Sequence, residues 1–101
     1  MGSDVLFATR QGVDIKNDNM YRVILHNDDS TPMDVVVLVL YLAFKKQEKE
    51  AVDLMLAAHI HGRAIIDTLP KKLATARQAE AMKVASSFGC VDFKITLEED
   101  A

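Results

Sequence analysis

A change of hydrophobic period between residues 21 and 44 constrains the fold more than any other feature of the sequence. Residues 21–26, YRVILH, alternate in the manner of a well-covered β-strand. The turn-forming residues 27–29, NDD, follow directly, and apolar side chains then recur every fourth residue from 36 to 44. The pattern predicts a strand, a turn and a helix in immediate succession.

The start of this helix carries several signals of its own. Thr31 is a suitable cap, and Pro32 would occupy the first helical position. Asp34 falls where a capping-box acid would, and its charge favours the positive end of the helix dipole. We therefore expect the helix to begin at Thr31-Pro32.

The remaining elements follow from the same kinds of signal. A helix is expected to begin with acidic residues and to end at a glycine. Strict alternation of apolar and polar residues is typical of a half-buried strand. These signals predict a helix from Glu48 to Gly62, a short strand at residues 64–66, a helix from Pro70 to about Ser87, and a strand over residues 91–98. The order β-α-α-β-α-β predicts an open two-layer α+β domain.

Length, charge and cysteine content exclude several classes of protein. A chain of 101 residues supports one domain with a small core, and we expect residues 1–19 to be a flexible tail before a domain at 20–101. The net charge of −3 disfavours a nucleic-acid binder, and no apolar run approaches the length that spans a membrane. With Cys90 as the single cysteine, we expect a cytoplasmic protein.

Most polar candidates have an ordinary structural interpretation. Residues 27–29 could serve as turn and cap residues, His59 as a core histidine, and Met33 and Met55 as gap fillers. His59 and His61 diverge by about 200° on a helix, so they cannot share a tetrahedral metal ion. The sequence contains no recognisable catalytic or phosphate-binding motif, and we expect no cofactor, no metal and no enzyme activity.

Binding is better supported by the spacing. Met55 and His59 are four residues apart on one helix, and Met33 and Val36 are three apart on another, so each pair shares a face. If the two helices pack, an apolar recess lies beside Asn27, Asp28 and His59. Such a site suits a free peptide N-terminus, whose protonated amine would meet the acceptors while one large side chain fills the recess.

The stretches "YRVILHNDDSTPMDVV" and "MLAAHIHGRAI" resemble the ClpS family, adaptors that deliver N-degron substrates to the Clp protease. The resemblance covers about residues 20–98, and the combination of N-D-D-x-T-P-M with M-L-x-x-H-x-x-G is specific. It implies three helices packed against a three-stranded antiparallel sheet. It also implies a monomeric adaptor that binds proteins beginning with Leu, Phe, Tyr or Trp and docks on the N-terminal domain of a ClpA-type unfoldase.

The resemblance assigns roles to individual residues. It implies that Asn27, Asp28 and His59 hold the α-amino group of the substrate and its first peptide unit. The side-chain pocket that it implies consists of Thr31, Met33, Val36, Met55, Ala58 and Phe93, and Met33 screens the shape of the side chain. Lys72 and Arg77 match positions that dock on the unfoldase.

Several of these positions depart from the family pattern. Ser30 stands where an aromatic residue is frequent, and Lys72 stands where a glutamate is expected for docking. Ala58 replaces a typical valine and should deepen the pocket, whereas Phe93 replaces a typical leucine and should narrow it. These changes predict a shifted side-chain preference.

Two other functional hypotheses remain open from the residues. The first is a non-catalytic protein–protein docking module with a different partner, which would need an exposed patch and no small pocket. The second is a metal-dependent hydrolase that uses His26, Asp28 and His59. A recess between the first two helices would distinguish the adaptor from the docking module.

Overall fold

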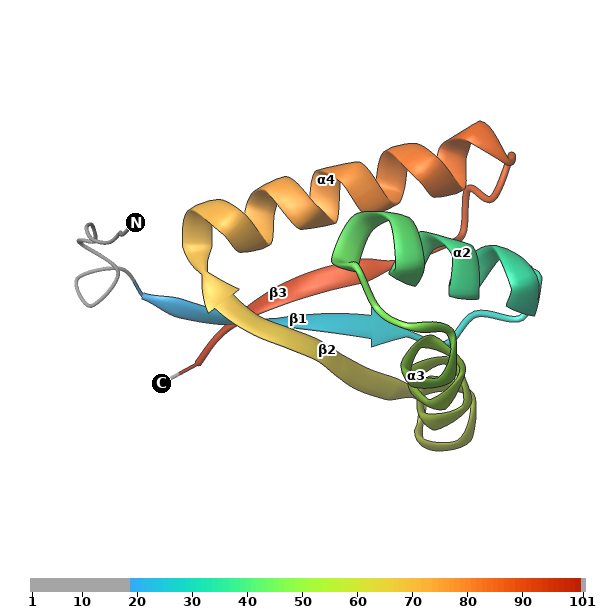
Figure 1. The fold of residues 1–101 in the computed structure, drawn as a ribbon, viewed down its shortest axis with the longest axis horizontal. Helices are drawn as coiled ribbons and strands as arrows, with labels where there is room; N and C mark the ends of the chain where they lie inside the picture. Colours follow the sequence, from blue (N-terminus) through green and yellow to red (C-terminus); the bar gives the residue numbers. More distant parts are fainter. Residues whose placement is uncertain (1–18, 101) are drawn as a thin grey trace.

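The computed structural model describes residues 19–100 and confirms the predicted order of elements. The elements are β1 (Met20–His26), α2 (Met33–Phe44), α3 (Glu48–His61), β2 (Arg63–Pro70), α4 (Lys71–Ser87) and β3 (Ile95–Glu99), as Figure 1 shows. The expected tail, apart from Asn19, lies outside the described residues. None of the helices within residues 19–100 is long and apolar enough to cross a bilayer.

The three strands form an antiparallel sheet in the order β2-β1-β3, so β1 is central. Leu25 is aligned with Ala64 on one side and with Ile95 on the other. A register shift after Val23 leaves Ile66 as an extra residue in β2, and its side chain is buried in the core. The sheet thus presents the end of β1, and the loop after it, beside the helices.

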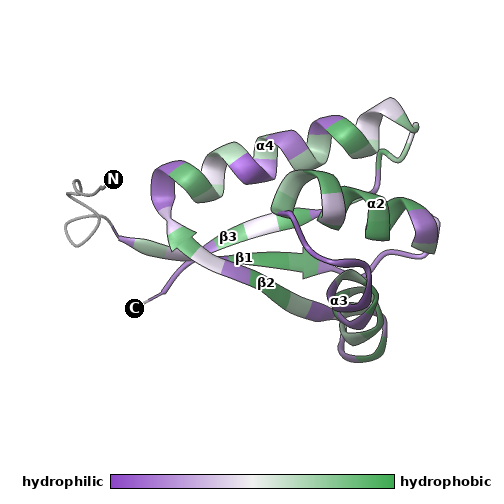
Figure 2. Cartoon of the chain, viewed as in Figure 1, coloured by the Kyte–Doolittle hydropathy of each residue, from purple (hydrophilic) through white to green (hydrophobic). Residues whose placement is uncertain are grey.

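The three helices pack against this sheet, as predicted, around one core. Val23 and Leu25 are buried on the helix-facing side of β1. α4 packs through its small residues, because its alanines at 74, 81 and 85 are fully buried. Figure 2 shows that the later part of β1 is hydrophobic, whereas the link between α2 and α3 is hydrophilic.

The predicted cap of α2 is wrong. Pro32 is the N-cap residue, and its carbonyl accepts hydrogen bonds from Val35 N and Val36 N, both 3.1 Å long. Thr31 makes no cap hydrogen bond, because its backbone amide is turned to the Asp28 carboxylate and its side chain is buried. Asp34 does lie in the first turn, where its carboxylate accepts from Val35 N at 2.9 Å instead of completing a capping box.

A partly buried lysine fixes the link between α2 and α3. Lys46 Nζ lies 2.8 Å from an Asp67 oxygen on β2 and 3.5 Å from a Glu50 oxygen on α3. Burial lowers the pKa of Lys46, but these two carboxylates outweigh it, so the pKa is above its ordinary value. The ion pairs therefore join the link to β2 and to the start of α3.

Two strand boundaries differ from the prediction. β2 extends from Arg63 to Pro70, beyond the predicted residues 64–66, because it pairs with β1 along its whole length. β3 begins at Ile95 and not at residue 91. The chain first turns through Gly89, whose φ is 76°, and Val91 is left 84% exposed.

Candidate functional site

A recess of about 280 Å³ lies between α2, α3 and the loop that follows β1. Its lining residues come from two parts of the chain. They are Leu25, His26, Asn27, Asp28, Asp29, Thr31, Pro32, Met33 and Val36 from the end of β1 to α2, and Met55, Ala58 and His59 from α3. The volume is at the low end for ligand pockets, which suits one side chain and its attached polar group better than a larger molecule.

Two backbone hydrogen bonds place the loop that carries the polar residues. Asn27 N donates to Gly62 O at 3.0 Å, which joins the loop to the end of α3. His26 N donates to Lys94 O at 3.1 Å, which joins it to the segment before β3. Gly62 ends α3 with φ of 90°, a conformation that favours glycine. The loop and α3 are thus connected directly.

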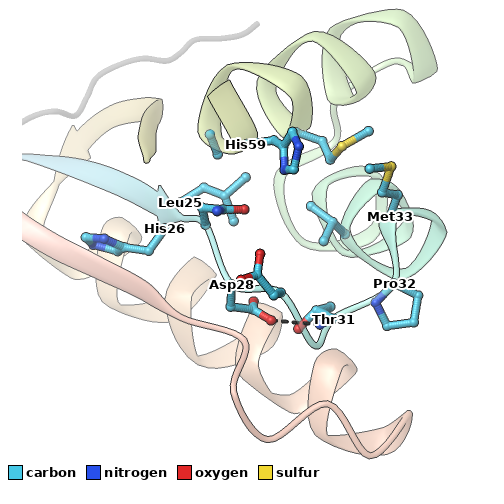
Figure 3. Close-up of a pocket in the computed structure, with 12 residues that line it drawn as sticks. Leu25, His26, Asp28, Thr31, Pro32, Met33 and His59 are labelled. Carbon is cyan, nitrogen blue, oxygen red and sulfur yellow. Dashed lines mark hydrogen bonds between the residues drawn. The ribbon is translucent and has the colours of Figure 1, made fainter. Parts of the chain in front are cut away.

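The structure brings Asn27, Asp28 and His59 together at one recess. Figure 3 shows Asp28 on the loop below the cavity and His59 on α3 above it, with both side chains on its walls. Among residues 19–100, the side chains of Asn27 and His59 make no hydrogen bond, and both residues are exposed. Their hydrogen-bonding groups are therefore available to a ligand, and the alternative of a buried core histidine at position 59 is wrong.

Asp28 is held as a carboxylate by its own turn. One of its oxygens, Oδ1, accepts from Thr31 N at 2.7 Å, from Ser30 N at 3.0 Å and from Ser30 Oγ at 3.1 Å. Partial burial raises the pKa of Asp28, but these donors outweigh it and place the pKa below the ordinary value. Within the described part of the chain, Oδ2 accepts no hydrogen bond, which leaves a charged oxygen for a ligand.

The remaining lining is apolar. Val36 and Ala58 are buried, Met55 is half-buried, and Met33 is exposed at the entrance. The pairs Met33/Val36 and Met55/Ala58 come from facing turns of α2 and α3. Methionine side chains are flexible and polarizable, so this wall can adapt to differently shaped apolar groups.

The structure does not bring Phe93 to the recess, which corrects that part of the predicted pocket. Phe93 is 2% exposed and belongs to the main core, and it does not line the cavity. The alternation predicted for residues 91–98 correctly placed the Phe93 side chain on the buried side. The residue lies in the irregular segment before β3, where its side chain is part of the core.

His26 lies at the edge of the recess, but its ring bonds elsewhere. His26 Nε2 is 2.7 Å from Thr96 Oγ1 on β3. Burial, with Lys94 and Arg63 nearby, lowers the pKa of His26. Among residues 19–100, no three His, Cys, Asp or Glu side chains are grouped as metal ligands.

The two predicted docking residues lie on α4 and do not line the recess. Lys72 is exposed, whereas Arg77 is half-buried and donates to Ala43 O at the end of α2, 2.9 Å away. Five residues apart on a helix, the two side chains diverge by about 140°. They therefore do not form a single patch.

Four lining residues were absent from the predicted site: Leu25, His26, Asp29 and Pro32. Their signal in the sequence was their adjacency to predicted site residues in one short turn. Leu25 could not be distinguished from other core residues by pattern, because it contributes to the core and to the cavity at once.

Comparison with known proteins places this chain in a family. Residues 16–95 match the family described as ATP-dependent Clp protease adaptor protein ClpS. The ATP-dependent Clp protease adapter protein ClpS of Shewanella loihica is 43% identical over 76 residues, covering 75% of this chain and 74% of that protein. The corresponding adapter of Shewanella pealeana is 43% identical over 72 residues, or 71% of each chain.

A solved structure shows the same fold. Agrobacterium tumefaciens ClpS2 bound to L-phenylalaninamide superposes with a TM-score of 0.78 at 29% identity, covering 82% of this chain and 99% of that one. The family match extends over most of the described residues, including the whole recess. The chain therefore belongs to the ClpS family of Clp protease adaptors.

Proposed function

We propose that the recess binds the first residue of a protein whose N-terminal side chain is bulky and apolar. The protonated α-amine contacts the free oxygen of Asp28, while Asn27 and His59 contact the amine and the first peptide unit. The side chain enters the space between Met33 and Met55. The observation that carries the proposal is a single cavity with a charged carboxylate oxygen at one end and apolar walls at the other.

The comparison structure supports this assignment of ligand chemistry. The Agrobacterium relative is bound to L-phenylalaninamide, a molecule that combines one free amine with one aromatic side chain. The carboxylate, amide and imidazole groups found here match the amine and the amide of such a ligand. Leu, Phe, Tyr and Trp are accordingly the first residues that we propose as ligands.

The energies are sufficient for reversible binding. Two or three charge-assisted hydrogen bonds contribute about 1.5–3 kcal/mol each. Burial of one Leu or Phe side chain adds about 1.5–3 kcal/mol, and the loss of freedom on association subtracts several. The balance is at most about 8 kcal/mol, which corresponds to dissociation constants of about 1 μM or weaker and allows a carrier to release its cargo.

Delivery completes the proposed function. A monomeric cytoplasmic adaptor would carry the bound protein to the N-terminal domain of a ClpA-type AAA+ unfoldase. Lys72, exposed near the start of α4, and Arg77 would contribute to docking. Because Arg77 also donates to Ala43 O, its contribution includes holding α4 against α2. The proposed role involves no catalysis.

Fluorescence anisotropy with two matched peptides tests the binding step. A peptide that begins with Phe should bind, and the same peptide with an acetylated amine should bind at least about tenfold more weakly, since the charge at Asp28 loses its partner. Equal affinities would refute amine recognition. They would favour instead a docking module that uses another surface.

A further inference from the structure

A second cavity adjoins the recess on the other side of a narrow ridge, residues 30–32. This cavity has a volume of about 390 Å³, and we refer to it as the groove. Ser30, Pro32 and Val35 form one side of it, and residues 88–92 after α4 form the other. In Figure 3 the segment after α4 runs beside the part of the loop that contains Asp28 and Thr31.

The groove exposes large apolar side chains on a fixed backbone. Phe88 is 53% exposed and Val91 is 84% exposed. Three hydrogen bonds onto the last turns of α4 hold the segment: Phe88 N to Ala85 O at 3.0 Å, Gly89 N to Ser86 O at 2.9 Å and Cys90 N to Ala85 O at 3.0 Å. Apolar groups kept in water by a rigid segment are a feature of interaction surfaces.

The recess and the groove meet at the ridge, which contributes residues to both. Pro32 lines both cavities. The Ser30 hydroxyl lies 3.1 Å from Asp28 Oδ1 in the recess and 2.9 Å from Asp92 Oδ2 in the groove. One hydroxyl has one proton, so it donates to one of these carboxylates at a time. The other carboxylate keeps an acceptor oxygen for an N–H group that crosses the ridge.

We infer that the groove holds the second to fourth residues of the bound protein and that it selects an apolar side chain among them. This inference rests on the proposed function. A chain whose amine is at Asp28 and whose first side chain is in the recess must leave past the residues that line it, and Pro32 on the ridge is one of them. Three extended residues cover about 10 Å, roughly twice the spacing of neighbouring chains in a sheet, so they can cross a ridge one chain thick.

The lining residues give the groove an apolar portion and a hydrogen-bonding portion. Phe88 and Val91 would cover the apolar side chain, and Asp92 with Ser30 would accept hydrogen bonds from peptide N–H groups. L-Phenylalaninamide has no residue that could reach the groove. It therefore reports on the recess alone.

Isothermal titration with three kinds of ligand tests the inference: L-phenylalaninamide, Phe-Gly-Gly-Gly-amide, and three tetrapeptide amides with Leu at position 2, 3 or 4. At least one Leu peptide should bind about threefold to tenfold more tightly than the all-glycine peptide. Val91→Ser and Phe88→Ala should each remove most of this gain and leave the affinity for L-phenylalaninamide unchanged. Ile60→Ser is the matched control, because Ile60 is 69% exposed and lines neither cavity.

The outcomes separate the two proposals. If L-phenylalaninamide binds but no Leu peptide gains affinity, or if the gain survives in both groove variants, the groove is not a subsite and the recess assignment stands. If none of the ligands binds, the proposed function fails, and the groove proposal fails with it. Thermal unfolding of each variant shows whether an affinity change reflects a folding defect.

Discussion

The recess and the sheet face turned away from the helices both carry several polar side chains, but they use them differently. We refer to that face of the sheet as the open face. On it, Arg63 makes two hydrogen bonds of 3.1 Å to Glu98. Arg22 lies 3.5 Å from Asp100, and His26 bonds to Thr96. In the recess, by contrast, the side chains of Asn27 and His59 have no partner within residues 19–100.

The difference separates polar side chains that bond to one another from polar side chains that remain available to a ligand. The open-face charges pair with one another, and Ile24 on this face is fully buried although it lies opposite the helices. The recess groups are held in place by backbone contacts and keep their own hydrogen-bonding capacity. Polar residues are thus informative about function where the fold positions them without consuming their bonds.

The largest effect should come from neutralising the recess. Asp28→Asn keeps an oxygen that can accept from Thr31 N and Ser30 N, so the turn should survive, but it removes the charge facing the ligand amine. We expect affinity for a Phe-initiated peptide to fall about 10- to 100-fold in anisotropy measurements. Asp34→Asn, a nearby acid outside the recess, is the control. Equal affinity of the two variants would contradict the role given to Asp28.

The pH dependence of binding sharpens the same contrast. The pKa of Asp28 is below its ordinary value of 3.8, so its carboxylate stays charged throughout the range from about pH 5 to 9. The ligand amine, with a free pKa of about 7.7–8.0, loses its proton as the pH rises. Affinity should therefore decline above about pH 8, by up to about tenfold per pH unit. Constant affinity up to pH 9.5 would show that the amine is not bound as a cation.

A smaller change is expected from altering the apolar wall. Ala58→Val adds two methyl groups to a buried position of the recess, which should weaken a Trp-initiated peptide about tenfold and a Leu-initiated peptide less. Ala57→Val, on the neighbouring position of α3 outside the recess, is the matched control. A competition series with the four proposed first residues would measure the shift. An unchanged order of preference would mean that Ala58 does not limit the pocket.

The smallest effect on binding should come from the open face. Hydrogen bonds from Arg63 lower the pKa of Glu98 below its ordinary value of 4.5. Its stabilisation is therefore present above that value and is lost as the pH falls through the folded pKa. Glu98→Gln should leave peptide affinity unchanged and slightly lower the melting temperature at pH 7, and this difference should shrink as the pH falls below 4.5. A loss of affinity would break the comparison between the two regions.

The sequence predicted the fold almost completely, because the hydrophobic periodicity and the turn and capping residues indicate the same elements along most of the chain. The helix from Glu48 to Gly62 is confirmed at both ends, where acidic residues and a glycine mark its polarity. The alternation at residues 91–98 was misleading, because Gly89 and the hydrogen bonds after α4 turn the backbone before the strand can pair. Pairing with a distant strand, which local pattern cannot report, decided where β2 and β3 begin and end.

The candidate site was predicted where spacing on helices determines proximity. Met55, Ala58 and His59 share one face of α3, and Met33 and Val36 share one face of α2, so helix packing brings them together. Phe93 could not be placed in this way, because its position depends on an irregular segment. The groove was not predicted for the same reason: Val91, expected in a half-buried strand, lies in the irregular segment before β3 and is exposed.

The hydrogen bond between Asn27 and Gly62 has a kinetic consequence. Because it links the loop to the end of α3, we expect the polar groups on either wall to move together. Cargo can then enter and leave without reshaping the protein, and association should proceed at about 10⁵–10⁷ M⁻¹s⁻¹, as for preformed surfaces. The lifetime of the loaded adaptor is consequently set by how tightly the cargo is held and not by the opening of a gate.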